Sequence, residues 1–252
     1  MKWSSMFSAL DENIPDTITW SRSTDFDCLG RVVICPLDTP DKPGLLIRTN
    51  DPKLLMASLM EMDAGIRFRK PRERGRGCVI ADDVIIGKNT IIGDNVIIKN
   101  ASIGENCTIH SGVIIGEDGF GFAGGKRFPH IGKVLIGDNV EINDNCCIAR
   151  GCLKDTILED GVKIDNLCHV AHNCHLKKDV ILTAGVTMGG SVTIGERVWV
   201  GVGATITDGI EIGDDVIVGV GAVIIHDIPD RDVVVGNPAR AIPRKSRYTF
   251  QG

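Results

Sequence analysis

The chain has 252 residues and a formal net charge of −5, and only 4% of its residues are aromatic. This charge gives no reason to expect binding to nucleic acid or to an acidic membrane surface. The longest uncharged run, residues 180–195, is too short and too rich in glycine to span a bilayer, and the first residues lack the apolar core of a signal peptide. We therefore expect a soluble cytoplasmic protein without a membrane span.

The first part of the chain predicts a small α/β domain over residues 1–68. Residues 31–35 and 44–48 have the β-branched and aliphatic content of short strands. An Asp-Pro pair then suits the start of a helix, which the spacing of the apolar residues extends over about 52–63. The basic residues 69–77 follow, and we interpret them as a linker.

An aliphatic side chain recurs at every sixth position between residues 158 and 228. Neither a helix nor a simple alternating strand keeps such a period. A fixed short repeat predicts stacked units that bury one continuous core, as in a parallel β-helix. The twelve positions are Leu158, Ile164, Val170, Leu176, Leu182, Met188, Ile194, Val200, Ile206, Ile212, Val218 and Ile224.

The same repeat occurs upstream in pieces, so we predict a β-helix over residues 78–230 with about seven coils stacked ~4.8 Å apart. Residues 117–133 break the repeat and predict an insertion loop, and residues 231–252 predict a C-terminal cap. Three phenylalanines in the insertion imply that it covers a substrate, a neighbouring subunit or its own coils.

The cysteines do not predict a metal site or disulfides. Cys107, Cys146, Cys168 and Cys174 all occupy the small inward position of their hexads, where cysteine acts as a small hydrophobic residue. No CxxC pair is present, and reduced thiols fit a cytoplasmic protein.

The repeat resembles that of the left-handed β-helix acyltransferases, in which three hexads form one triangular coil. Two further segments resemble UDP-3-O-acylglucosamine N-acyltransferases of the lipid A pathway. One is residues 45–54, LLIRTNDPKL, which is similar to the end of their uridine-binding domain, and the other is the loop over residues 118–123. The resemblance implies a homotrimer, and two nearly uncharged faces of the predicted helix agree with burial between subunits.

The strongest polar cluster is IDNLCHVAHNCH over residues 164–175, which holds three of the six histidines. Its first ten residues resemble the active-site signature of the same N-acyltransferases, which implies His172 as general base and Asn166 as a substrate contact. Both occupy the same outward hexad position, and we interpret them as lying on either side of a shared prism edge. Histidine suits this role because it accepts a proton near neutral pH.

Other residues are candidates for binding the acceptor substrate. We expect the N-terminal domain and the insertion to hold a nucleotide-linked amino sugar. The individual candidates are Asp165, Glu141, Phe120, Gly121 and Phe122.

The end of the predicted helix is similar to the tail of many acetyl-CoA-dependent hexapeptide transferases. This resemblance implies that Asn237, Pro238, Arg240 and Lys245 lie beside coenzyme A, although solvated terminal charges explain the basic residues equally well. The small residues Gly203, Ala204, Gly221 and Ala222 leave room for a pantetheine arm, and tight subunit packing explains them as well.

From these features we predict a homotrimeric N-acetyltransferase that uses acetyl-CoA and no metal. Its acceptor would be the amine of a UDP- or dTDP-linked amino sugar for surface glycans. The first alternative is an acyl-carrier-protein-dependent UDP-3-O-acylglucosamine N-acyltransferase, against which we count the lack of a second histidine near residues 208–209.

Two further alternatives are a γ-type carbonic anhydrase and a non-catalytic scaffold. The carbonic anhydrase would need zinc held by three convergent histidines. His169, His172 and His175 alternate around a prism corner, so we do not expect them to converge. The scaffold would bind no coenzyme A.

Overall fold

The computed structural model describes residues 18–22, 25–26, 32–42, 45–62 and 74–244. The chain divides into two compact units, Met1–Lys70 and Pro71–Gly252. The described residues contain no helix with the length and apolarity that a bilayer span requires.

The N-terminal unit contains a parallel three-stranded sheet and one helix. Both predicted strands and the predicted helix are confirmed within a residue or two, whereas the first strand was not anticipated from the sequence. The Asp51 carboxylate caps the helix by accepting a hydrogen bond from the backbone N–H of Leu54 at 2.9 Å. The elements are β1 (Ile18–Trp20), β2 (Val32–Pro36), β3 (Leu45–Thr49) and α1 (Pro52–Met62).

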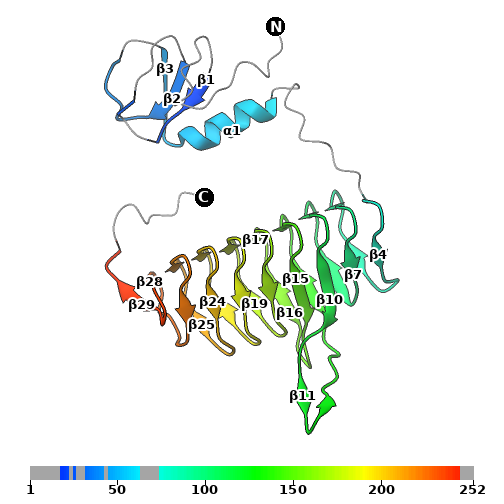
Figure 1. Cartoon of the computed structure of the whole chain (residues 1–252). Coiled ribbons are helices and arrows are strands. Elements are labelled where there is room, and N and C mark those ends of the chain that lie inside the picture. The colour runs from blue at the N-terminus through cyan, green and yellow to red at the C-terminus, as the bar shows by residue number, and fades with distance from the viewer. Residues whose placement is uncertain (1–17, 23–24, 27–31, 43–44, 63–73, 245–252) are drawn as a thin grey trace. The chain divides into compact units, whose positions relative to one another are not determined.

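The second unit is a three-sided parallel β-helix in which each side is one sheet (Figure 1). The eight-stranded sheet contains β4 (Val79–Ile80), β7 (Ile97–Ile98), β10 (Ile114–Asp118), β15 (Cys147–Arg150), β18 (His169–Val170), β21 (Thr187–Met188), β24 (Thr205–Ile206) and β27 (Val223–Ile224). The seven-stranded sheet contains β5 (Ile85–Ile86), β8 (Ala101–Ile103), β13 (Val134–Ile136), β16 (Thr156–Leu158), β19 (His175–Leu176), β22 (Thr193–Ile194) and β25 (Glu211–Ile212).

The nine-stranded sheet forms the third side, and its last strand runs antiparallel to the one before it. Its strands are β6 (Ile91–Ile92), β9 (Thr108–Ile109), β14 (Glu141–Ile142), β17 (Lys163–Ile164), β20 (Ile181–Leu182), β23 (Trp199–Val200), β26 (Ile217–Val218), β28 (Val233–Val235) and β29 (Arg240–Ile242).

The six-residue repeat sets the register of all three sheets. Ile164 pairs with Leu182 and Leu182 with Val200, so residues one coil apart lie directly above one another. These aliphatic side chains are buried and form one continuous core. The four inward cysteines of the repeat are also buried, which confirms their structural role: Cys107, Cys146, Cys168 and Cys174.

The turns between strands depend on residues that tolerate a left-handed backbone. Asn173 has a φ of 63° at such a corner, which asparagine adopts more readily than most residues. Side-chain oxygens also link successive coils, and Asn166 accepts a hydrogen bond from the backbone N–H of Asp144 at 3.0 Å. The corners are therefore fixed by hydrogen bonds as well as by the core.

The insertion leaves the β-helix two residues later than the sequence indicates. β10 continues to Asp118, where the Arg150 guanidinium donates to the Asp118 carboxylate at 2.8 Å. The chain then forms an antiparallel hairpin of β11 (Phe122–Ala123) and β12 (Lys126–Arg127), which projects from the coils (Figure 1). Phe120 is 86% exposed and contacts Phe122, so the hairpin does not bury its aromatic side chains against its own coils.

A cavity at the centre of the core should be costly. Leu182 is fully buried, and we expect Leu182→Ala to lower the free energy of unfolding by about 2–5 kcal/mol. Urea unfolding followed by circular dichroism measures this change. Thr187→Ala, which removes an exposed side chain from a neighbouring strand, should change the value by less than about 0.5 kcal/mol. If both substitutions lowered the free energy of unfolding by the same amount, the buried aliphatic row would not be the main source of stability.

Candidate functional site

His172 lies at the corner turn between β18 and β19 and is half-buried. Its imidazole fits between two glycines that approach it from different segments. A Cβ atom on Gly190, one coil further along, would lie 2.5 Å from ring atom Cε1. A Cβ atom on Gly119, at the base of the insertion, would lie 2.8 Å from ring atom Cδ2. The absence of both side chains therefore creates the space that the imidazole fills.

Asn173 determines the protonation of this imidazole. The Asn173 amide is oriented by the backbone, because Nδ2 donates to the Lys154 carbonyl at 3.1 Å and Oδ1 accepts from the Cys152 N–H at 3.1 Å. Oδ1 also lies 3.0 Å from His172 Nδ1. An amide oxygen only accepts, so Nδ1 carries the hydrogen and Nε2 keeps a lone pair. This hydrogen bond therefore selects the tautomer in which Nε2 is the acceptor nitrogen of the ring.

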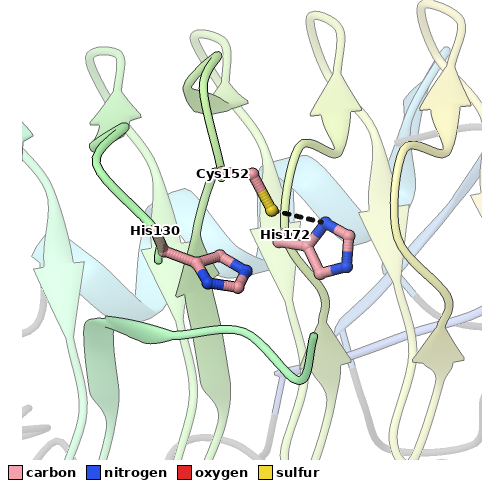
Figure 2. A group of neighbouring side chains, drawn as sticks. All are labelled: His130, Cys152 and His172. Carbon is pink, nitrogen blue, oxygen red and sulfur yellow. Dashed lines mark hydrogen bonds between the residues drawn. The ribbon is translucent and has the colours of Figure 1, made fainter. Parts of the chain in front are cut away.

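Two more side chains surround His172. His130, from the end of the insertion, lies edge-on to its ring with the centroids 5.4 Å apart. The Cys152 sulfur, from the corner loop between β15 and β16, lies 3.8 Å from His172 Nδ1 (Figure 2). Figure 2 shows the sulfur and a nitrogen of His130 both facing the same space beside His172. The insertion and the irregular corner loop therefore converge on the predicted base.

Cys152 has little thiolate character in this setting. Burial raises the pKa of its thiol, and the negative charge of Asp118 raises the pKa further. A nucleophilic cysteine requires a lowered pKa. The Cys152–His172 pair is therefore not arranged as a catalytic thiolate.

The structure separates Asn166 from His172 within one chain, so their placement on a shared prism edge is wrong. Asn166 lies in the turn before β18 and His172 in the turn after it. Each hexad contributes one strand and one corner, so residues six positions apart occupy successive corners. Asn166 is exposed and uses its oxygen to link coils, which leaves its amide nitrogen available.

The other predicted acceptor-binding residues lie in three parts of the chain, and the segment of Phe120, Gly121 and Phe122 directly follows Gly119, which borders the imidazole. Asp165 accepts from the Asn166 backbone N–H at 2.7 Å, at the same corner as Asn166. Glu141 lies on the nine-stranded sheet, where its carboxylate is 3.2 Å from His110 Nε2. Phe120, Gly121 and Phe122 lie in the projecting hairpin segment, and Gly121 accepts from the Phe128 N–H at 2.9 Å.

Part of the predicted coenzyme site is wrong. Ala204 and Ala222 are fully buried inside the β-helix, because they occupy the second inward position of each hexad, and their side chains cannot contact a bound molecule. Gly203 and Gly221 lie at open corners with a left-handed backbone, and no atom lies within 4 Å of the position of an added Cβ.

The residues of the C-terminal segment are described only in part. The Asn237–Pro238 peptide bond is cis, and Arg240 is exposed and lines a pocket at the last coil with His226 and Asp227. Lys245 lies outside the described residues.

Sequence reasoning missed most of the groups around His172. These are Gly119, His130, Cys152, Asn173 and Gly190. The insertion breaks the repeat, and such a break is the sequence signal that a loop carries function. These contacts join residues up to 53 positions apart in the sequence, from residue 119 to 172, so no local motif predicts them.

The chain is similar to known hexapeptide-repeat proteins. A family model described as the hexapeptide repeat of succinyl-transferase matches residues 83–117 and 191–225. A UDP-3-O-acylglucosamine N-acyltransferase of Delftia acidovorans is 48% identical over 101 residues, or 38% of this chain and 30% of that protein. The same enzyme from a Caulobacter species is 36% identical over 153 residues, or 59% of this chain and 45% of that protein.

A solved structure shows the fold. A UDP-N-acetylglucosamine acyltransferase from Campylobacter jejuni aligns with a TM-score of 0.62 and 24% identity, over 67% of this chain and 66% of that one. The chain has the left-handed parallel β-helix of these acyltransferases: the repeat predicts the parallel β-helix, and the resemblance implies its left hand. The matched segments span less than half the length of the two curated relatives described above.

These relatives overturn the predicted acetyl-CoA-dependent N-acetyltransferase. Both curated relatives, at 48% and 36% identity, are UDP-3-O-acylglucosamine N-acyltransferases, which is the first alternative to the predicted function. The lack of a histidine near residues 208–209 was counted against that alternative, and the structure places another imidazole, that of His130, next to His172.

The slot around His172 can be tested directly. We expect Gly190→Ala to displace the imidazole, since the new Cβ would lie 2.5 Å from Cε1 and 2.8 Å from Nε2. In NMR spectra, the ring signals of His172 should shift while those of His110, which pairs with Glu141 on another sheet, remain in place. Unchanged His172 signals in a folded variant would show that the slot is not closed by this glycine.

Proposed function

We propose that this chain is an N-acyltransferase that acylates the amine of a UDP-linked, 3-O-acylated glucosamine, with His172 as general base. The observation that carries the proposal is the His172–Asn173 hydrogen bond of 3.0 Å, which leaves Nε2 free as an acceptor. The substrate class is supported by the relatives named UDP-3-O-acylglucosamine N-acyltransferase.

The chemistry follows from the protonation of the imidazole. An amine that attacks an acyl thioester must lose a proton as the amide forms, and Nε2 of His172 takes that proton. The thioester carbon then releases the thiol. General-base catalysis of this kind contributes about 10²–10⁴ in rate.

The developing negative charge on the thioester oxygen needs a donor. The backbone N–H of Gly190 is the best placed candidate, because Gly190 stacks directly on the His172 ring. Among the described residues, no backbone carbonyl of a turn or loop accepts a hydrogen bond from this N–H. A preorganised backbone donor of this kind stabilises an oxyanion without reorganisation.

The proposed enzyme acts as a homotrimer whose subunits meet along one corner of the β-helix. Val202 and Val220 are exposed there and stack in the same row as Asn166, eighteen residues apart per coil. Leu167, beside Asn166, is exposed and has a φ of 62°, a conformation that costs a bulky residue about 1–2 kcal/mol. An apolar partner surface would stabilise this row and bring Asn166 toward the His172 corner of the next subunit.

Removal of the base should abolish most of the turnover. With UDP-3-O-acylglucosamine and an acyl-carrier-protein thioester as substrates, we expect His172→Ala to lower kcat by about 10²–10⁴. His175→Ala is the matched control, because its ring pairs with Glu159 at 2.7 Å on a neighbouring strand and faces no reacting group. Mass spectrometry of the product measures both. Acetyl-CoA as donor should support little product, and preference for acetyl-CoA would refute the proposed donor.

Assembly should depend on the apolar corner. We expect Val220→Glu to weaken trimer formation, because it places a charge on a residue that is 69% exposed in the single chain and buried in the proposed trimer. Analytical ultracentrifugation measures the mass. Ile85→Glu is the control, since Ile85 is similarly exposed but lies on the seven-stranded sheet, whereas Val220 lies in the turn between β26 of the nine-stranded sheet and β27 of the eight-stranded sheet. A trimer that tolerates Val220→Glu but not Ile85→Glu would place the interface on another face.

A further inference from the structure

We propose that His130, Cys152 and His172 form a binding site for a soft divalent cation of the zinc type. One ligand atom from each residue lies within 4.8 Å of those of the other two. In a tetrahedral zinc site, bond lengths of about 2.0–2.3 Å place neighbouring ligand atoms roughly 3.3–3.8 Å apart. The Cys152 sulfur and His172 Nδ1 already lie 3.8 Å apart, so small side-chain shifts complete the geometry.

The strongest evidence for a metal is the buried ring nitrogen Nε2 of His130. The side chain is only 1% exposed, and Nδ1 lies 3.0 Å from the Phe128 carbonyl oxygen. A carbonyl only accepts, so Nδ1 carries the hydrogen and Nε2 has a lone pair. Among the described residues this buried Nε2 has no hydrogen-bond partner. An unpaired buried acceptor is costly, and a cation would satisfy it.

The surroundings of the three residues match those of metal ligands. A histidine that binds a metal usually donates its other ring N–H to a carbonyl or carboxylate, as His130 does to Phe128. Two imidazoles and one thiol are the donors that favour zinc over magnesium or calcium. Three protein ligands leave the fourth position of a tetrahedral ion open to solvent. Binding releases the Cys152 thiol proton to solvent.

A metal at this site would switch off the proposed catalytic base. Coordination requires the lone pair on His172 Nδ1, the atom that faces Cys152, so the hydrogen must move to Nε2 through solvent. The acceptor nitrogen is then blocked. This consequence rests on the proposed function, whereas the metal site itself does not. Zinc and amine acylation should therefore exclude one another.

Metal binding is measured first and without substrate. We expect the purified full chain to retain one Zn²⁺ per chain after equilibration and gel filtration, measured by elemental analysis. Cys152→Ser and His130→Gln should each weaken binding by at least about tenfold, the lower end of the loss from a missing supporting residue. Cys147→Ser, which removes another half-buried thiol, should bind zinc as the parent chain does.

Cobalt provides a spectroscopic readout of the same ligands. Co²⁺ alone should give a thiolate charge-transfer band in the parent chain and in Cys147→Ser, but not in Cys152→Ser. Thermal unfolding identifies any variant that has lost its fold. If His130→Gln does not fold, the nearly isosteric Cys152→Ser decides the outcome alone. Absence of stoichiometric zinc in the parent chain, or zinc binding that survives both Cys152→Ser and His130→Gln, would overturn the proposal.

The inhibitory effect is tested last, with each variant compared with its own metal-free turnover. Equimolar Zn²⁺ should lower the turnover of the parent chain at least about tenfold and that of Cys152→Ser less than twofold. Stoichiometric zinc binding without inhibition would refute the exclusion while the site stands. A chain without any turnover in metal-free buffer would refute the proposed function and leave the binding result intact.

Discussion

The stacking of identical coils is the constraint on which the site depends. Because residues eighteen positions apart lie directly above one another, the side chain at each corner determines how much space its neighbour has. His172 fits only because Gly190 occupies the equivalent corner of the next coil. A regular fold thus produces a slot for the His172 imidazole by the omission of one side chain, with no change in the path of the backbone.

The two irregular segments complete what stacking alone cannot supply. The residues of the regular coils alone do not surround the His172 imidazole. The insertion contributes Gly119 and His130, and the corner loop contributes Cys152. The Asp118–Arg150 hydrogen bond of 2.8 Å ties the start of the insertion to the neighbouring strand β15.

The sequence predicted the fold well because the period of six is a local property. Aliphatic residues such as Ile164 and Leu182 repeat in register, and burial of that row predicts coils stacked in a parallel β-helix, whereas the left hand was implied by the resemblance. The site was predicted only in part. The resemblance pointed to His172, but the contacts of His130 and Cys152 arise where two breaks in the repeat meet in space, and spacing along the chain carries no information about that meeting.

The position of the hydrogen on His172 links the two proposals. With Nδ1 donating to Asn173, the free Nε2 is a base; with Nδ1 bound to a cation, the same ring is inert. Asn173 and a metal therefore compete for one atom. The amide holds its orientation through two backbone contacts that do not involve the ring, so its acceptor stays in place in either state. The ring can thus return to its basic form when the cation leaves, without any rearrangement of the coil beneath it.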